Sequence, residues 1–359
     1  MEDLKIGIVG LGLIGGSLAK ALKEKAGIEN IFAYNRSQNS IDEAVKEGVI
    51  KKGSTDDLKI LSGCDIIFIC SPVELVSDYT LKLSAISNAI ITDAASTKAE
   101  IMESAKNCKR FIGGHPMTGS EKVRFKAADS HLFENALYVL CKGESCSEED
   151  FILLKSIVEK IGAIPEIMNG YEHDKAVGII SHLPHLVSAE LVNFAAENDK
   201  GFLNRLAAGG FKDITRISSS SPELWEQIIS SSNGIIIKLL EAYIENLNKL
   251  SQALKEKDKD FIFNFFSKAK EYRDNIADNQ AGLMPSQYEI WAEVSDKPGI
   301  IGNIATLLGD NGINIKNINI QNNREYEGGC LRISLDFERE AENALKVLTN
   351  AGYACRIKN

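Results

Sequence analysis

The 359-residue sequence lacks the features of a membrane or secreted protein. No apolar run approaches the roughly 18 residues that a membrane-spanning helix needs. The seven cysteines are odd in number and contain no C-x-x-C pair, which argues against a disulfide framework or a zinc site and favours reduced, packed thiols. The acidic N-terminus runs straight into a predicted strand, without the basic and apolar segments of a signal peptide. We therefore expect a cytoplasmic protein.

Positive charge is also in deficit, since 41 Lys and Arg residues face 50 Asp and Glu residues, a formal net charge of −9. A nucleic-acid or anionic-membrane partner requires a basic surface, so we expect neither. A small anionic substrate stays open, because a few local arginines are enough to bind it. The composition, 44% hydrophobic and 25% charged, is typical of a globular protein, and the length suits two or three domains.

Short apolar runs alternate with helical patterns through the first half of the chain. Continuous apolar runs are typical of strands buried on both faces of a parallel sheet. We therefore predict a Rossmann-type α/β domain over residues 1–168. Its predicted strands are residues 5–9, 30–34, 65–70, 89–92, 110–113, 137–140 and 163–167.

The second part of the chain, residues 169–284, has no convincing strand pattern. Helical periodicity dominates, with a long amphipathic helix over residues 234–254 and an interruption at Pro184. We predict an all-helical second domain. By analogy with other dinucleotide-dependent enzymes, such a domain serves as substrate lid and dimer interface.

The third part, residues 285–359, changes character again. Its pattern predicts the order β-α-β-β-α-β, a ferredoxin-like α+β domain. The Asp-Lys-Pro-Gly turn at 296–299 and the strand entry at 311–315 resemble the ACT domain, a regulatory module that binds amino acids at subunit interfaces. The resemblance implies an effector site formed by Asp296, Pro298, Gly299, Ile300 and Asn314.

A G-x-G-x-x-G motif, Gly10-Leu11-Gly12-Leu13-Ile14-Gly15, lies between the first predicted strand and an amphipathic helix. Glycines are needed where the chain turns tightly and where backbone meets a pyrophosphate, which then binds the free N–H groups of the helix. In this setting the motif predicts a dinucleotide site that includes Gly10, Gly12, Leu13, Ile14 and Gly15.

The end of the second predicted strand, Asn35-Arg36-Ser37, lacks the acidic residue that usually binds the ribose 2′-hydroxyl of NAD⁺. Without this acid a 2′-phosphate is not repelled, and Arg36 with Ser37 is able to bind one. Local chemistry therefore admits NADP⁺ as well as NAD⁺. Arg36 stacking on adenine, or pointing into solvent, is an equal alternative.

Two more loops follow predicted strands at the edge where ligands of parallel sheets bind. Cys70, Ser71 and Pro72 follow the third strand and are predicted to contact the cofactor. Ser96 follows the fourth strand and His115 follows the fifth, so both are predicted near the reacting atoms. A histidine with an ordinary pKa of about 6.5 is suited to accept a hydroxyl proton as hydride leaves the same carbon.

The helical region contains a second group of functional candidates. His182 and His185 lie three residues apart, but no convincing third ligand accompanies them, so we predict no metal site. Arg216 is able to hold a carboxylate through paired hydrogen bonds, which makes it the natural substrate anchor.

These motifs together resemble prephenate dehydrogenases. The resemblance covers nearly the whole chain through GLGLIGGS, CSPV, the Asp-x-x-Ser-x-Lys loop, GGHPMTGSE, SHLPH, GGFKDITRI and a downstream tryptophan. It implies oxidative decarboxylation of prephenate to 4-hydroxyphenylpyruvate in tyrosine biosynthesis, with hydride transfer to a nicotinamide cofactor, and it favours NAD⁺. It also implies a homodimer, and an aromatic amino acid, tyrosine, as inhibitory effector at the ACT domain.

By the same resemblance His115 binds the ring hydroxyl, Ser96 orients the pair and Arg216 holds the ring carboxylate. Ser181 and His185 line the pocket near the pyruvyl group, with Trp225 nearby. The family also contains arogenate (cyclohexadienyl) dehydrogenases, which stay an alternative.

Two more distant interpretations remain. A 3-hydroxyacid or 6-phosphogluconate-type dehydrogenase shares the architecture but uses a lysine of the helical domain, and Lys175 lies in no similar motif. A non-enzymatic sensor of dinucleotide and amino acid would not need His115, Ser96 and Arg216.

Overall fold

The structure, a computed structural model, describes residues 3–119, 124–278, 288–294, 297–322, 329–335 and 337–358. It divides into two compact units, Met1–Lys268 and Ala269–Asn359. The three predicted parts, a Rossmann-type sheet, a helical region and a ferredoxin-like sheet, are all present, so the predicted fold class is confirmed. The predicted boundary between residues 284 and 285 lies outside the described residues.

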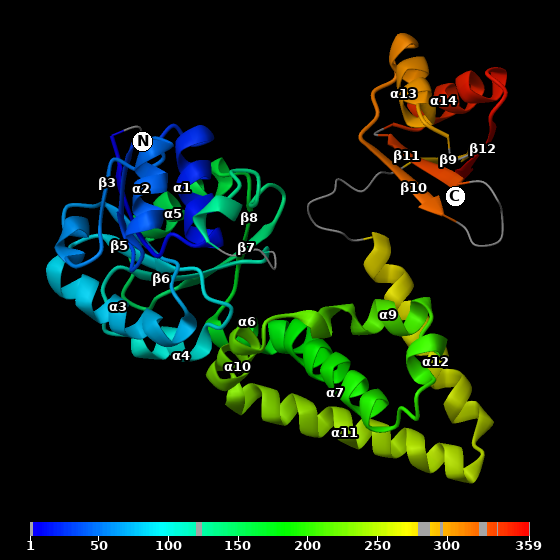
Figure 1. Ribbon diagram of the computed structural model, residues 1–359, viewed down its shortest axis with the longest axis horizontal. Coiled ribbons are helices and arrows are strands. Elements are labelled where there is room, and N and C mark those ends of the chain that lie inside the picture. The colour runs from blue at the N-terminus through cyan, green and yellow to red at the C-terminus, as the bar shows by residue number, and fades with distance from the viewer. Residues whose placement is uncertain are drawn as a thin grey trace. The chain divides into compact units, whose positions relative to one another are not determined.

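An eight-stranded sheet forms the N-terminal part of the first unit (Figure 1). Its strands are β1 (Lys5–Val9), β2 (Asn30–Tyr34), β3 (Lys52–Ser54), β4 (Ile66–Ile69), β5 (Ile90–Asp93), β6 (Phe111–Pro116), β7 (Leu137–Lys142) and β8 (Ile164–Ile167). They are ordered β3-β2-β1-β4-β5-β6-β7-β8. All seven predicted strands are present, and β3 is a short edge strand that the apolar pattern did not indicate.

Strand direction changes once across the sheet. The six strands from β3 to β6 in spatial order are parallel, whereas β7 is antiparallel to β6 and β8 is parallel to β7. Parallel neighbours need a crossover, usually a helix. Between β6 and β7 the described residues contain only a 3₁₀ turn, Phe125–Ala127, so β7 returns antiparallel. An apolar run reveals a strand but not its direction, which is why the sequence predicted a parallel sheet throughout.

Two layers of helices bury the sheet (Figure 1). Ile66 and Phe68 of β4 face one core, and Ile67 and Ile69 face the other, so the whole strand is apolar. The first core is covered by α1 (Leu13–Glu24), α2 (Gln38–Lys46) and α5 (Glu148–Lys160), and the second by α3 (Val73–Ile86) and α4 (Ala99–Ser104).

The helical region follows the sheet. Its helices are α6 (Gly170–Val177), α7 (Leu183–Glu197), α8 (Leu203–Leu206), α9 (Gly209–Thr215), α10 (Pro222–Ser231), α11 (Asn233–Glu256) and α12 (Lys259–Asp278). The predicted long helix over 234–254 is confirmed as α11. No helix within the described ranges is long and apolar enough to cross a membrane.

A π-helical turn, Gly178–His182, joins α6 to α7 without a break. Pro184, in the first turn of α7, has no N–H and its ring disfavours a regular helical turn before it. The N–H of Leu183 therefore reaches the carbonyl oxygen of Gly178, five residues back. The helix continues through Pro184, where the sequence suggested an interruption. Such π turns occur frequently at functional sites.

The C-terminal unit has a four-stranded antiparallel sheet ordered β10-β11-β9-β12. Ile290, Leu331 and Ile333 belong to the core that its two helices close. Gly299, with φ of 89°, begins the first of these helices as the predicted turn requires. The elements are β9 (Tyr288–Val294), α13 (Ile300–Asp310), β10 (Asn317–Asn322), β11 (Gly329–Leu335), α14 (Glu338–Asn350) and β12 (Ala354–Lys358).

Candidate active site

The glycine motif forms the turn between β1 and α1. A Cβ at Gly10, which has φ of 95°, would lie 2.7 Å from the carbonyl oxygen of Cys70. A Cβ at Gly15 would lie 1.9 Å from the carbonyl oxygen of Gly10, so neither position admits a side chain. A Cβ at Gly12, the N-cap of α1, would have nothing within 4 Å, and no side chain caps the helix. The first N–H groups of α1 therefore border open space that suits a phosphate.

Asn35 connects the end of β2 to this turn. Its Oδ1 accepts the N–H of Leu11 at 2.9 Å, and its Nδ2 donates to the carbonyl oxygen of Ser37 at 2.9 Å. Arg36 and Ser37 themselves are exposed. Of the three residues predicted near the ribose, Asn35 thus holds the glycine turn, whereas Arg36 and Ser37 lie at the surface.

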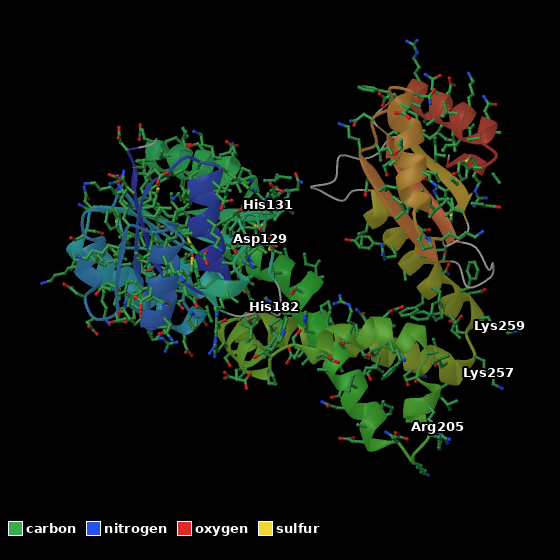
Figure 2. All side chains as sticks on the ribbon, turned by 45° about the horizontal axis from the view of Figure 1, so that its top comes forward. Asp129, His131, His182, Arg205, Lys257 and Lys259 are labelled. Atoms are coloured by element: carbon green, nitrogen blue, oxygen red, sulfur yellow. The ribbon has the colours of Figure 1, made fainter. Side chains whose placement is uncertain are left out.

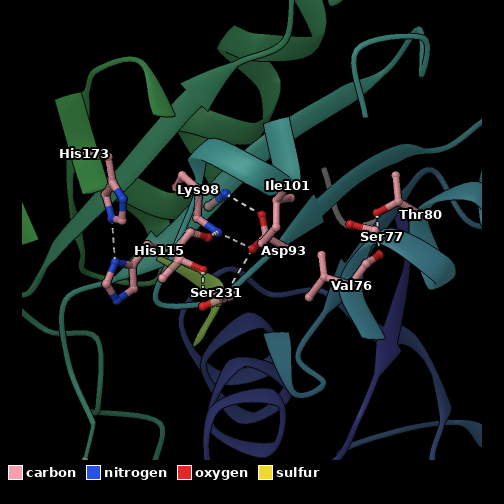
Figure 3. A network of polar contacts seen from close by, with 12 residues as sticks. Val76, Ser77, Thr80, Asp93, Lys98, Ile101, His115, His173 and Ser231 are labelled. Carbon is pink, nitrogen blue, oxygen red and sulfur yellow. Dashed lines mark hydrogen bonds and ion pairs between the residues drawn. The ribbon is translucent and has the colours of Figure 1, made fainter. Parts of the chain in front are cut away.

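Behind these loops Asp93 and Lys98 form a fully buried ion pair (Figure 3). Asp93 also accepts the N–H groups of Ala95 and Gly114, each at 3.0 Å, and Lys98 donates to the carbonyl oxygen of Thr97 at 2.8 Å. The pair therefore closes the loop between β5 and α4 and attaches it to β6. Ser96, half-buried, lies within this loop.

Asp174 of α6 binds the same loop from the helical side. Its Oδ1 accepts the N–H of Lys98 at 2.6 Å and its Oδ2 accepts the N–H of Ala99 at 2.8 Å, so the carboxylate covers the start of α4. A second link is the 3.0 Å hydrogen bond between the Thr97 and Ser231 hydroxyls. Hydrogen bonds therefore connect the helical region directly to the loop at the carboxyl edge of the sheet.

His115 lies in β6, almost completely buried, and meets a second histidine. Its Nδ1 is 2.7 Å from Nε2 of His173 (Figure 3). Nδ1 of His173 is in turn 2.7 Å from Oδ1 of Asp174. Burial lowers the pKa of His115 well below its usual value, and His173 and Lys98 lower it further. His115 is therefore neutral at pH 7 and is able to accept a proton.

A second group of side chains lies on the π turn, α7 and α10. The ring of His185 stacks on Trp225 with centroids 3.6 Å apart, and the ring of His182 meets Trp225 edge-on at 5.9 Å. His182 lies at the end of the helical region nearest the sheet (Figure 2). Burial lowers its pKa to about 4, and its Nδ1 has no hydrogen-bond partner among the residues that the structure describes. Burial also lowers the pKa of His185, and the exposed Arg216 lies close enough to lower it further.

The remaining predicted residues of the first unit have varied surroundings. Ser181 is half-buried, and its carbonyl oxygen accepts a hydrogen bond from Nδ1 of His185 at 2.9 Å. Cys70 packs against the glycine turn, and burial raises the pKa of its thiol to about 12, so it is not a nucleophile. Ser71 and Pro72 precede α3. Lys175 is exposed beside the buried Asp174, which gives no support to a catalytic lysine.

The predicted effector residues are not brought together within one chain. Pro298, Gly299 and Ile300 follow the end of β9, whereas Asn314 precedes β10. The strand register places the start of β10 beside the start of β9, at the opposite end of the sheet. Asp296 lies outside the described residues.

The sequence interpretation missed His173 and Asp174 as functional residues. It rejected the nearby histidines as metal ligands and placed only His185 near the substrate. Within the described part of the chain no group of three His, Cys, Asp or Glu side chains is arranged to hold a metal ion. One feature of the sequence could have indicated these two residues: a histidine followed by an acid, eight residues before the S-H-L-P-H segment.

The fold and this site define a nucleotide-binding oxidoreductase with a helical second domain. Two family models match the chain, "Prephenate dehydrogenase, nucleotide-binding domain" over residues 18–166 and "Prephenate dehydrogenase, dimerization domain" over residues 169–268. The chain belongs to the prephenate dehydrogenase family, as its motifs predicted.

Relatives and solved structures agree with this assignment. The prephenate dehydrogenase of Bacillus subtilis (strain 168) is 36% identical over 94% of this chain and 93% of its own length, and that of Lactococcus lactis subsp. cremoris (strain MG1363) 33% identical over 97% and 98%. The A. aeolicus prephenate dehydrogenase structure, in complex with hydroxyphenyl propionate and NAD⁺, gives a TM-score of 0.72 at 30% identity, covering 77% of this chain and 99% of that one. Synechocystis arogenate dehydrogenase gives 0.70 at 33%, covering 76% and 100%.

Replacing Lys98 by Met should destabilise the protein strongly, because it leaves the Asp93 carboxylate buried without its cation. The expected loss in free energy of unfolding is roughly 3–5 kcal/mol. Denaturant unfolding measures it. Lys82→Met, which breaks an ion pair whose side chains are 60% and 53% exposed, is the control and should cost far less. Equal costs for the two variants would contradict a structural role of the buried pair.

Proposed function

We propose that the protein oxidatively decarboxylates prephenate to 4-hydroxyphenylpyruvate and transfers hydride to NAD⁺. The observation that carries this proposal is the neutral, buried His115 beside the loop of Ser96, at the carboxyl edge of a dinucleotide-binding sheet. Similarity to two prephenate dehydrogenases over nearly the whole chain supports the substrate. The test is the formation of reduced nicotinamide with prephenate and arogenate, each supplied with NAD⁺ and with NADP⁺.

In this reaction Nε2 of His115 receives the proton of the ring hydroxyl, and Ser96 orients the pair. The bound nicotinamide accepts the hydride from the carbon that carries this hydroxyl. Arg216 holds the ring carboxylate, while Ser181, His185 and Trp225 line the pocket beside the pyruvyl group. Because loss of carbon dioxide makes the ring aromatic, the protein's contribution is orientation and charge placement.

The glycine turn fits the pyrophosphate of the cofactor, and we propose NAD⁺ as the preferred form. The NAD⁺ bound in the A. aeolicus structure supports this preference. Gly10, Gly12, Leu13, Ile14 and Gly15 would hold the pyrophosphate. Further cofactor contacts are proposed for Asn35, Arg36, Ser37, Cys70, Ser71 and Pro72.

Arogenate is the second candidate substrate, because the structurally similar Synechocystis enzyme is an arogenate dehydrogenase. The two substrates differ only in the keto or amino group of the side chain, so the residues that discriminate between them must lie near His185 and Trp225. Turnover of arogenate alone in the assay above would replace the first proposal by this one.

We also propose that the protein is a homodimer formed by the helical region. Ile237, Leu240, Ile244 and Leu247 form a stripe on α11 in which each side chain is 36% to 48% exposed. Their spacing of three to four residues places them on one face of the helix. An apolar face of this kind is typical of a protein–protein interface, and the matching "dimerization domain" covers this helix.

For the C-terminal unit we propose an aromatic amino acid, tyrosine, as effector. The exposed turn at Pro298 and Gly299 leads into α13, and the first turn of a helix suits a carboxylate. Because Asn314 lies at the opposite end of the sheet, a site that uses both groups needs a second copy of the chain. Asp296 stays a predicted contact.

A Gly12→Ala substitution should abolish dinucleotide binding without harming the fold, because its methyl group enters only the open space that the pyrophosphate needs. Gly15→Ala should instead destabilise the protein, since its Cβ meets the backbone of Gly10. Calorimetric titration with NAD⁺ and thermal unfolding separate the two effects. Tight NAD⁺ binding by Gly12→Ala would place the cofactor elsewhere.

The paired substitution Leu240→Glu, Leu247→Glu should convert the dimer to monomer, because it places two charges in the apolar stripe. Light scattering after gel filtration gives the mass. Lys238→Glu, an exposed change on the same helix outside the stripe, should leave the dimer intact. A monomeric native protein would refute the proposed dimer.

His115→Asn should lower kcat by about 10²–10⁴ with little change in KM, because asparagine cannot accept the proton. Arg216→Ala should chiefly raise KM, because the guanidinium binds substrate and transition state alike. Initial-rate kinetics of both variants give kcat and KM separately. The reverse pattern would exchange the two roles.

A further inference from the structure

The buried histidines form a directed chain of three side chains. The Asp174 carboxylate already accepts two backbone N–H groups, and its Oδ1 is 2.7 Å from Nδ1 of His173. Since a carboxylate only accepts hydrogen bonds, Nδ1 of His173 must carry a proton. Nε2 of His173, 2.7 Å from Nδ1 of His115, is then the acceptor when His173 is neutral.

The direction of these bonds determines the tautomer of His115. With Nε2 of His173 as acceptor, Nδ1 of His115 carries the proton and donates it. In a neutral imidazole the other nitrogen is then unprotonated. Nε2 of His115 therefore has a free lone pair, the form that a base needs.

We propose that His115 and His173 form a two-histidine proton relay anchored by Asp174, in which the charge of the accepted proton comes to rest on His173. The relay rests on the proposed function and deepens it, since it follows the proton beyond the group that meets the substrate. His173 acts through His115 and is a positioning and relay residue.

Each transfer is balanced. The substrate hydroxyl proton binds Nε2 of His115 as hydride leaves the same carbon. The Nδ1 proton of His115 moves to Nε2 of His173, which becomes an imidazolium bound to the Asp174 carboxylate. When carbon dioxide leaves, the electron pair of the bond between ring and carboxylate enters the ring. The oxygen of the former ring hydroxyl then takes a proton back along the same path, from His173 through His115. The relay therefore gains and loses one proton in each turnover.

Electrostatics favours His173 over His115 as the place for the charge. Both rings are buried, so burial makes an imidazolium costly at either position and the contact with Asp174 decides between them. Asp174 contacts His173 directly and reaches His115 only through it. The ionisable groups that surround the pair are Lys98 and Asp93 of the β5–α4 loop, Asp174 of α6 and His182 of the π turn.

Two substitutions of His173 separate relay from mere positioning. In His173→Gln the amide oxygen is able to accept the His115 Nδ1–H bond but not a proton, whereas His173→Leu loses both functions. We expect kcat with prephenate and NAD⁺ to fall at least about tenfold in both variants, with KM nearly unchanged. The acid limb of the plot of kcat against pH should also shift, because the accepted proton now stays on His115. Wild-type kcat in His173→Gln would overturn the relay and leave positioning alone.

The tautomer is measurable without any substrate. The chain has five histidines, so ¹⁵N-histidine labelling gives few ring signals, and His115→Asn and His173→Gln assign two of them. We expect His115 of the free protein to be protonated at Nδ1 and unprotonated at Nε2, in the native protein and in His173→Gln. A His115 ring protonated at Nε2 in the native protein would overturn the proposal.

The turnover assay and the tautomer measurement test the proposed function and the relay separately. If neither prephenate nor arogenate is turned over but the tautomer is as expected, the proposed substrate is wrong and the hydrogen-bond direction stands. If prephenate is turned over but His115 has the other tautomer, the relay is wrong and the proposed function stands. Thermal unfolding of each variant detects loss of fold, and Asp174→Asn, which weakens the anchor without changing His173, should then reproduce the fall in kcat.

Discussion

The hydrogen bonds of the Asp174 carboxylate hold the site together. One side chain of α6 accepts the backbone N–H groups of Lys98 and Ala99 and a ring N–H of His173. It thereby attaches the helical region to the loop after β5, covers the start of α4 and orients the histidine pair. Three N–H donors compensate the buried negative charge, and the partial positive charge at the start of a helix adds to them. Together with the Thr97–Ser231 hydrogen bond, this contact holds the helical region against the loop after β5.

A buried polar cluster of this kind stabilises one arrangement only if every member finds its partners. Asp93, Lys98, Asp174 and His173 all have them, and they come from rigid elements: β5, α4 and α6. His182 is the exception, because its Nδ1 has no partner among the described residues. It belongs to the side of the cluster that faces Trp225, where the substrate pocket is proposed. The satisfied part of the cluster provides a fixed frame, and the ring of His182 lies edge-on to Trp225.

The sequence could predict the elements of the fold because local chemistry specifies them. Runs such as Ile66–Ile69 are apolar throughout since both faces of the strand are buried, and the glycines at 10 and 15 leave no room for a side chain. Strand direction, the edge strand β3 and the passage of a helix through Pro184 depend on tertiary contacts, which periodicity does not record. His115, Ser96 and Arg216 could be proposed as site residues from motif and position. His173 and Asp174 could not, because their proposed function depends on the contact of His173 with His115 across 58 residues of sequence.

The end of β2 combines one side chain that holds the glycine turn with two side chains that lie at the surface. Asn35 both accepts the Leu11 N–H and donates to the Ser37 carbonyl oxygen, whereas an aspartate could only accept. The asparagine therefore fixes the glycine turn but supplies no carboxylate to a ribose. Arg36 and Ser37, the proposed cofactor contacts that follow, are exposed. The glycine turn is thus constrained by its backbone, whereas these two neighbouring positions lie at the surface, where a change of side chain usually costs little stability.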